Sequence, residues 1–395
     1  MRVLVLAHVF PRTVDDSMGA FLLHLADALA ERGAQTDVVA PHAANLADDE
    51  TLGAARVHRF HYAPARWERL AYTGTMHEIV GRGMGGKILF AFFCAAFLFK
   101  SLSVARAARP QFLHAHWWLP GGLVGALVSM LTRVPLVITT HGTDVEMMLR
   151  RTRWATPLAR FTFARARTVT CGSTYLREQL LTLGVVDAAQ VRVIPMPVNP
   201  EFKIQDSGFR EDANFEFRIS NLVLTVARLT AQKSIATLID ALAILCARGR
   251  DAKLKVIGEG PERTALEQQT RALNLQDRVE FVGALAQKEL PRHYAECAVF
   301  VLPSIREGMG LVFAEALLCG APVIAANSGG VTDIVKDGET GLLVPERDAR
   351  ALADAIERML NDRALAAQLA SNGAAWVRER YTRGRVAAQF AEVLK

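Results

Sequence analysis

Short apolar runs alternate with longer segments in which apolar residues recur at helical spacing, and this order repeats along almost the whole chain. A short apolar run bounded by turn residues is typical of a strand buried on both faces. Repeated strand and helix segments favour parallel sheets with helices on their faces. No other feature constrains the fold as strongly. In the first half, the pattern predicts strands over residues 1–7, 36–40, 55–60, 111–116, 135–140 and 191–194.

The clearest interruption of this repetition is the proline-rich stretch 195–200, which reads Pro-Met-Pro-Val-Asn-Pro and is extended by the polar run 205–214. Proline-rich stretches are typical of domain boundaries. A second series of strands and helices follows the interruption. Its predicted strands are residues 222–226, 253–257, 279–282, 298–302, 322–325 and 341–344.

The sequence therefore predicts an α/β protein with two doubly wound, Rossmann-like domains that face one another across a cleft. We expect the first domain over residues 1–195 and the second over 196–375, with a C-terminal helix in 376–395 that packs back on the first domain. Ligands of such sheets bind beyond the carboxyl ends of the strands. Functional residues are therefore expected in the loops that follow strands.

The composition is that of a soluble globular protein, with 51% hydrophobic and 22% charged residues. Five cysteines are scattered and form no Cys-x-x-Cys pair, which indicates reduced core residues and a cytoplasmic protein. The apolar N-terminus stops at Pro11 without a small-residue cleavage pattern. It therefore predicts a first strand rather than a signal peptide.

The net charge of +6 is modest, but basic residues gather in the stretch 150–167. This stretch has no nucleic-acid-binding motif and few interleaved aromatic residues, so nucleic acid is not a predicted partner. An anionic membrane surface or a phosphorylated acceptor fits better, and solvated arginines on helix surfaces are the alternative. The residues are Arg150, Arg151, Arg153, Arg160, Arg165 and Arg167.

The segment 88–99 is almost wholly apolar and is bracketed by Lys87 and Lys100. A membrane span needs about 20 such residues, so the segment is too short to cross a bilayer. A buried helix is the preferred interpretation, and a helix at a membrane interface is the second. The glycine-rich stretch 81–86 has no strand before it, so it predicts a flexible loop rather than a dinucleotide fingerprint.

The stretch 307–315 follows a predicted strand that ends at Pro303 and precedes an apolar stretch that ends at Gly320. This order predicts strand, loop and helix, with the helix beginning at Gly310. The unpaired N–H groups of the first helical turn would then point toward a phosphate. The residues of that turn are Leu311, Val312 and Phe313.

Two carboxylates belong to this unit. Glu307 lies in the predicted loop and Glu315 about one and a half turns inside the helix, so both can face one opening. A carboxylate beside a phosphate site suggests sugar hydroxyl groups as its partner, because it accepts hydrogen bonds through two oxygens. The alternative is a surface helix with two solvated glutamates.

Two cations follow the first strand of the second series: Arg228 lies at the strand end and Lys233 near the start of the next helix. Together they suit a diphosphate, since arginine offers a planar fork and lysine a point charge. Gly258 follows the next strand, but Arg263 stands where a dinucleotide fingerprint needs its third glycine. A nicotinamide site is therefore disfavoured.

His141 directly follows a predicted strand, and Gly142 allows an unusual backbone after it. A hydrogen-bonded core histidine is the alternative to a functional one. His114 and His116 share one face of a strand and could join His141 as metal ligands, but no carboxylate or cysteine completes the set by spacing. No metal and no cofactor are predicted. Gly19 stands at the first strand-to-helix turn, where a glycine lets a ligand approach the backbone closely.

Taken together, these motifs resemble the retaining glycosyltransferases of family 4, which have the two-domain GT-B architecture. Glu307 and Glu315 stand with seven residues between them, as in the signature of that family. The basic pair, the histidine and the N-terminal glycine turn are also similar. Further similar stretches are Pro303-Ser304, Gly308-x-Gly310, Gly320-x-Pro322-Val323-Ile324 and Ser328-Gly329-Gly330.

The resemblance implies that Arg228 and Lys233 hold the diphosphate of a nucleotide-sugar donor. It implies that Glu315 binds the ribose, and that Glu307 and His141 contact the transferred sugar. The implied catalytic residues are His141, Glu307, Arg228 and Lys233. The implied donor-binding residues are Gly19, Arg228, Lys233, Gly258, Glu307, Gly308, Met309, Gly310, Leu311, Val312 and Glu315.

The implied activity is transfer of a sugar from a nucleoside diphosphate donor, with a UDP-sugar favoured, to an acceptor hydroxyl with retention of configuration. The acceptor would be a sugar or a lipid-linked sugar in glycan, glycolipid or cell-envelope polysaccharide synthesis. The sequence has no Asp-x-Asp pair, in agreement with a metal-independent reaction. A nucleotide-sugar epimerase or hydrolase and a non-catalytic nucleotide-sugar sensor are the alternatives. The expected location is the cytoplasm, with peripheral contact to the inner face of the cell membrane left open.

Overall fold

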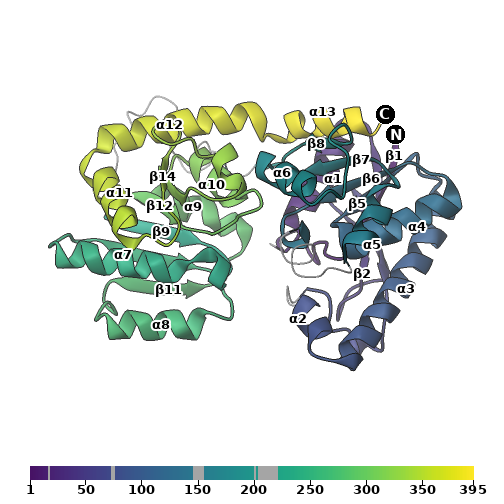
Figure 1. The fold of residues 1–395 in the computed structure, drawn as a ribbon, viewed down its shortest axis with the longest axis horizontal. Coiled ribbons are helices and arrows are strands. Elements are labelled where there is room, and N and C mark those ends of the chain that lie inside the picture. Colours follow the sequence, from purple (N-terminus) through teal and green to yellow (C-terminus); the bar gives the residue numbers. More distant parts are fainter. Residues whose placement is uncertain (17, 73–75, 146–154, 200–201, 203–220) are drawn as a thin grey trace. The chain divides into compact units, whose positions relative to one another are not determined.

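The chain folds into two α/β units, which Figure 1 colours mainly from purple to teal and from green to yellow. The first unit comprises residues 1–197 and 383–395, and the second comprises 198–382. The computed structural model describes all residues except 17, 73–75, 146–154, 200–201 and 203–220. Four predicted features therefore lie outside the described residues: Arg150, Arg151, Arg153 and the polar run 205–214.

Eight strands form the sheet of the first unit: β1 (Arg2–Leu6), β2 (Gln35–Pro41), β3 (Asp49–Leu52), β4 (Ala55–Phe60), β5 (Phe112–His116), β6 (Leu136–Thr140), β7 (Ala166–Cys171) and β8 (Val191–Val193). Their order is β3-β4-β2-β1-β5-β6-β7-β8. All neighbours are parallel except β3 and β4, which pair antiparallel. The order runs outward on both sides of β1, as in a doubly wound sheet.

The helices of the first unit are α1 (Ala20–Ala30), α2 (Met76–Gly81), α3 (Met84–Ala108), α4 (Leu123–Thr132), α5 (Ala155–Phe163), α6 (Thr174–Thr182) and α13 (Arg383–Val393). Helix α4 packs against both α3 and α5, whereas α1 packs against α13. Arg383 of α13 pairs with Asp27 and Glu31 at the end of α1. The last helix of the chain thus belongs to the first unit, where its yellow ribbon lies among teal and purple elements (Figure 1).

The second unit has a six-stranded parallel sheet made of β9 (Leu222–Val226), β10 (Lys253–Ile257), β11 (Val279–Gly283), β12 (Val299–Leu302), β13 (Val323–Ala326) and β14 (Leu342–Val344). The strand order is β11-β10-β9-β12-β13-β14. This order reverses between β9 and β12. Ligands of doubly wound sheets bind at the carboxyl ends of the two strands that flank such a reversal.

The helices of the second unit are α7 (Ile235–Ala247), α8 (Arg263–Ala272), α9 (Leu290–Glu296), α10 (Leu311–Leu318), α11 (Ala349–Asn361) and α12 (Arg363–Arg380). Helix α7 packs against α8 and α11, and α10 packs against α9 and α12. Because crossovers between parallel strands are right-handed, the reversal of strand order places the crossover helices α7 and α8 on one face of the sheet and α9 and α10 on the other. Helix α10, which carries Glu315, is therefore held between the sheet and α12.

Helix α3 packs on β1, β2 and β4 and against α4. It is 25 residues long, much longer than the apolar segment 88–99 from which a helix is predicted. Phe93 and Phe97 are fully buried, but Phe92 and Phe99 are 60% and 71% exposed. The predicted buried helix is thus buried on one face only. By length and composition α3 could cross a membrane, a property that it shares with core helices of soluble proteins.

The stretch 81–86 is not the flexible loop that the sequence predicts, because it contains the end of α2 and the start of α3. A Cβ at Gly86 would lie 2.1 Å from the carbonyl oxygen of Ile79, so this glycine lets the two helices touch. The sequence also fails to predict β3 and β7. The first reads Asp-Glu-Thr-Leu and the second Ala-Arg-Thr-Val-Thr-Cys, and neither is an apolar run.

The contact between α12 and α10 depends on Gly373. A Cβ there would come 2.4 Å from Leu317 Cδ2 and 2.9 Å from the carbonyl oxygen of Thr340. Since Leu317 is fully buried, we expect Gly373→Ala to lower the free energy of unfolding by about 1–3 kcal/mol. Urea unfolding followed by tryptophan fluorescence would measure this change.

Gly384 in α13 is the matched control, because a Cβ at this position meets nothing within 4 Å. Gly384→Ala should be neutral or stabilising, since alanine favours a helix over glycine by about 1 kcal/mol. Equal destabilisation by both substitutions would contradict the packing explanation.

Candidate functional site

The loops that follow β9 and β12 meet where the strand order of the second sheet reverses. The N–H of Ile305 donates to the carbonyl oxygen of Gln232 at 2.8 Å. In return, Gln232 Nε2 donates to the carbonyl oxygen of Arg306 at 3.1 Å. These bonds hold the two loops together at the edge of the sheet where ligands of doubly wound folds bind.

An ion pair joins the same two loops, because Lys233 Nζ contacts Glu307 Oε2. The two side chains are only 20% and 16% exposed. Burial raises the pKa of Glu307, but the charge of Lys233 and its hydrogen bond outweigh burial and hold this pKa below its usual value. Glu307 is therefore ionised at neutral pH. The structure thus brings together two residues that the sequence names as candidates in separate loops.

The loop that carries Glu307 is also fixed from its other side. The N–H of Arg306 donates to Ser328 Oγ at 2.7 Å, and the N–H of Gly330 donates to the carbonyl oxygen of Glu307 at 2.7 Å. Gly329 has φ +67°, and a Cβ there would lie 2.4 Å from the same Glu307 oxygen. The Ser328-Gly329-Gly330 turn thus fits closely against the Glu307 backbone, and only glycine allows this contact.

Helix α10 begins at Leu311, and Gly310 before it has φ 79°. This start agrees with the helix start predicted from the sequence. Within the helix, Glu315 is 7% exposed, and Tyr294 of α9 donates its hydroxyl to Glu315 Oε2 at 3.3 Å. Burial raises the pKa of Glu315 to about 7, although the bond from Tyr294 opposes this change. Tyr294 is not evident from the sequence, because no local motif links it to Glu315.

The predicted cation Arg228 is exposed in the loop after β9. Gly258 and Gly260 lie behind this loop: a Cβ at Gly258 would come 1.8 Å from the Ala227 carbonyl oxygen, and one at Gly260 2.2 Å from that of Leu229. Backbone packing therefore accounts for both glycines. A role of Gly258 in binding a donor stays a prediction.

In the first unit, β1, β5 and β6 end beside one another, and a histidine stands at or after each end. His116 Nδ1 lies 3.0 Å from His141 Nε2. The His141 ring lies 4.4 Å from the ring of Trp117 and 5.0 Å from that of Phe21. Burial lowers the pKa of His141 to about 3, and the charges of neighbouring histidines act in the same direction. His141 is therefore a neutral imidazole at physiological pH.

Asp144 organises the backbone around His141, a role that the sequence does not predict. Its Oδ1 accepts the N–H groups of His141 and Gly142 at 3.1 Å each, and its Oδ2 accepts that of Trp118 at 3.0 Å. Burial raises the pKa of Asp144 to about 6, although these backbone bonds oppose the rise. Asp144 thus ties the ends of β5 and β6 together and fixes the position of His141.

The alternative of a metal bound by His114, His116 and His141 does not fit the structure. His114 Nε2 lies 2.7 Å from Thr139 Oγ1, and the facing nitrogens of His116 and His141 bond to one another. The rings of His114 and His116 are 4.2 Å apart. The three histidines form a hydrogen-bonded and stacked group rather than converging metal ligands.

Gly19 precedes the first residue of α1 and has φ 78°. A Cβ there would lie 3.3 Å from Val9 Cγ1 and 3.4 Å from the Phe10 Cα. The left-handed backbone and the close neighbours both favour glycine at the turn after β1. The turn is at the carboxyl edge of the first sheet, as predicted, and its contact with a donor stays a prediction.

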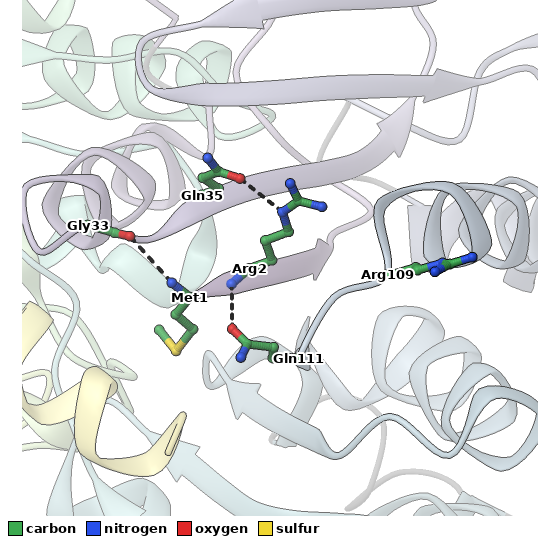
Figure 2. Close-up of a pocket in the computed structure, with 6 residues that line it drawn as sticks. All are labelled: Met1, Arg2, Gly33, Gln35, Arg109 and Gln111. Carbon is green, nitrogen blue, oxygen red and sulfur yellow. Dashed lines mark hydrogen bonds between the residues drawn. The ribbon is translucent and has the colours of Figure 1, made fainter.

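A cavity of about 450 Å³ lies at the opposite, amino edge of the first sheet. Figure 2 shows the residues that line it, among them Arg2 at the start of β1, Gln35 at the start of β2 and Gln111 just before β5. Arg2 donates to Gln35 and to Gln111 within it, each at 3.0 Å. Because it lies at the amino ends of the strands, this cavity is separate from the candidate site.

Comparison with known families and proteins gives consistent matches. The family described as Glycosyl transferases group 1 matches residues 210–376, and the Glycosyl transferase 4-like domain matches residues 17–197. The GDP-mannose-dependent alpha-(1-6)-phosphatidylinositol monomannoside mannosyltransferase of Mycobacterium tuberculosis is 31% identical over 273 residues, which cover 66% of this chain and 69% of that protein. The alpha-D-kanosaminyltransferase of Streptomyces kanamyceticus is 29% identical over 279 residues, which cover 68% of this chain and 72% of that protein.

Solved structures agree with these matches. Sucrose-phosphate synthase from Thermosynechococcus elongatus superimposes with a TM-score of 0.80 at 26% identity, covering 99% of this chain and 97% of that one. Anabaena HepE in complex with UDP and glucose superimposes with a TM-score of 0.73 at 22% identity, covering 100% of this chain and 99% of that one. This likeness supports the fold alone. The two parallel-sheet units, the family matches and these neighbours agree, and the chain therefore belongs to the family 4 glycosyltransferases of GT-B fold.

Proposed function

We propose that this glycosyltransferase moves a sugar from a nucleoside diphosphate sugar to an acceptor hydroxyl with retention of configuration. One observation carries the proposal: the Lys233–Glu307 ion pair lies at the strand reversal of the second sheet, beside the N-terminus of α10. A cation, a carboxylate and a helix N-terminus at one sheet edge suit a diphosphate joined to a sugar. Of the three N–H groups expected to face the phosphate, that of Phe313 donates to the carbonyl oxygen of Gly310 instead.

In the proposed mechanism, Lys233, Arg228 and the first N–H groups of α10 bind the diphosphate. These groups stabilise the negative charge that grows on the leaving phosphate as the glycosidic bond breaks. No metal is proposed for this step. Glu307 accepts hydrogen bonds from hydroxyls of the transferred sugar, and Glu315 accepts them from the ribose. The departing phosphate takes the proton of the acceptor hydroxyl, so no protein nucleophile is assigned.

His141 is proposed to contact the transferred sugar. Its pKa of about 3 supports a hydrogen-bonding role rather than a charged one. Asp144 would act as a positioning residue, because it holds the backbone on both sides of His141. Loss of either residue would then affect transfer more than nucleotide binding.

The base of the donor is the least constrained part of the proposal. The family resemblance favours uridine, whereas the M. tuberculosis relative is named as GDP-mannose-dependent. A ligand-observed NMR screen of UDP- and GDP-sugars separates the two bases. The acceptor is proposed to be a sugar or lipid-linked sugar, as in the synthesis of glycans, glycolipids or cell-envelope polysaccharides.

Variants of the cations and of His141 separate binding from chemistry. Lys233→Ala and Arg228→Ala should weaken nucleoside diphosphate binding and also lower turnover by on the order of a hundredfold or more. His141→Ala should leave nucleotide binding nearly unchanged while turnover falls steeply, because it contacts only the sugar. Isothermal titration with the nucleoside diphosphate and a transfer assay without added divalent ions measure the two effects.

Transfer to an added acceptor must exceed release to water, since the reverse would favour a hydrolase of the same architecture. A His141→Ala variant that loses nucleotide affinity as strongly as Lys233→Ala would contradict the assigned roles. Full transfer activity in His141→Ala would contradict them as well.

The raised pKa of Glu315 predicts a pH-dependent donor affinity. Only the ionised carboxylate accepts two ribose hydroxyls well, and with a pKa of about 7 its ionised fraction grows across neutral pH. Affinity for the intact donor should therefore rise by at most roughly tenfold from about pH 6 to about pH 8. The intact donor is the suitable probe because its diphosphate is esterified at both ends and does not titrate in this range.

Glu315→Gln should abolish this pH dependence. Glu307→Gln is the matched control and should retain it, because the pKa of Glu307 is held below its usual value by Lys233. A pH profile that survives in Glu315→Gln would remove Glu315 from the donor site.

The exposed apolar residues of α3 support the proposal that the protein binds peripherally to an anionic membrane surface. These residues lie one to four turns apart, and Lys87 on the same helix is exposed with them. Arg160 and Arg165 add exposed positive charge in the same unit. The apolar residues are Met84 (69% exposed), Ile88 (52%), Phe92 (60%) and Phe99 (71%).

The protein should therefore co-sediment at low salt with liposomes that contain anionic lipid. Each basic residue near an anionic surface contributes about 1 kcal/mol, so binding should weaken sharply as salt rises. Phe92→Ser with Phe99→Ser should abolish sedimentation. Leu273→Ser, which changes an exposed apolar residue of the second unit, is the matched control. If the wild type stays in the supernatant at low salt, the exposed face of α3 has another role.

A further inference from the structure

Two histidines and a glutamate converge at the carboxyl edge of the first sheet, apart from the residues assigned to the donor and to the transferred sugar. His42 directly follows β2 and His61 directly follows β4, and these adjacent parallel strands end in register at Pro41 and Phe60. Their rings therefore lie together, with centroids 3.9 Å apart. Glu68 reaches them from the segment that follows β4.

Both imidazoles present the same nitrogen to one carboxylate. His42 Nδ1 lies 2.9 Å from Glu68 Oε2, and His61 Nδ1 lies 3.2 Å from Glu68 Oε1. One donor atom from each of the three residues lies within 4.8 Å of the others. The Glu68 side chain is 2% exposed, that of His42 10% and that of His61 46%. A nearly buried carboxylate thus faces two ring nitrogens, with solvent access on the His61 side.

The other nitrogen of each ring is already engaged. His42 Nε2 lies 3.0 Å from the carbonyl oxygen of Leu46, which can only accept a hydrogen bond. His61 Nε2 lies 2.9 Å from Asp48 Oδ1. Each Nε2 therefore carries the proton, and in the neutral imidazole each Nδ1 has a lone pair. These outer bonds to a carbonyl and a carboxylate are the ones that metal-binding histidines make in proteins.

The resulting charge arrangement calls for a cation. Two Nδ1 lone pairs that face a carboxylate repel it. A divalent metal ion among the three donor atoms removes this conflict, because it accepts the two lone pairs and balances the carboxylate.

We propose that His42, His61 and Glu68 bind a zinc ion. Two imidazoles and one carboxylate form a common zinc ligand set, and a fourth position toward the exposed side of His61 would take water. Two nitrogen ligands disfavour magnesium and calcium, which prefer oxygen. The ion would tie the ends of β2 and β4 to the segment that leads into α2 and α3. This site is independent of the proposed reaction at the donor diphosphate.

The test uses untagged, full-length protein that has been stripped of metal, with zinc chloride alone as the probe. Isothermal titration should give one zinc per chain, and zinc should raise the thermal unfolding temperature. Cobalt at the same site should give the visible absorption of a four- or five-coordinate complex. Failure of the wild type to bind zinc saturably would overturn the proposal.

Variants locate the ion. His61→Ala removes a half-exposed ligand, so it should fold normally by circular dichroism and lose zinc affinity at least tenfold. Asp48→Asn changes only the outer partner of His61 and should lower affinity by about 10- to 100-fold. His58→Ala is the matched control, because His58 of β4 contacts two carboxylates, Asp37 and Asp49, and no second histidine among the residues that the structure describes.

His58→Ala should therefore bind zinc like the wild type. Unchanged zinc binding in His61→Ala, or an equal loss in His58→Ala, would overturn the proposed site.

Discussion

The candidate site depends on the ion pair between Lys233 and Glu307. It joins the loops after β9 and β12, the two central strands between which the order of the second sheet reverses. Both charges are largely removed from water, so each would be costly without the other. The pair keeps a cation and an anion ready at the same place. A ligand that carries a diphosphate and a sugar offers a new partner to each of them.

The sequence predicts strands well where apolar residues stand at consecutive or alternating positions. For β4, β9 and β10, the predicted bounds are those of the structure. Strand β9 is almost wholly apolar and buried, whereas β4 and β10 also carry exposed or half-buried polar residues. The missed strands lack this signal: β3 is a charged antiparallel edge strand, and β7 alternates threonine with other residues. The glycine-rich stretch 81–86 gives the opposite error, because it predicts a loop where the structure has helix. Its glycine Gly86 is needed for a close contact between α2 and α3 rather than for flexibility.

Site residues are predictable where the strand order alone brings them together. The loops after β9 and β12 must be neighbours in a doubly wound sheet, so the meeting of Lys233 and Glu307 follows from the pattern. The sequence cannot reveal that Tyr294 covers Glu315, or that Asp144 holds the backbone of His141, since these contacts depend on packing between elements. His42 and His61 are hidden for a related reason, as β2 and β4 pair directly while β3 between them in the chain lies at the edge.

Local contacts give Glu307 and Glu315, the two glutamates of the signature, different charge states. Burial raises the pKa of both. The charge of Lys233 reverses this effect for Glu307, which stays ionised throughout the physiological range. Glu315 accepts hydrogen bonds from the neutral side chains of Tyr294 and Gln287, which lower its pKa less than burial raises it, so its pKa stays near 7. Its charge therefore costs free energy until a ligand supplies further donors, so ionisation of Glu315 and binding of a hydroxyl-bearing ligand beside it favour one another.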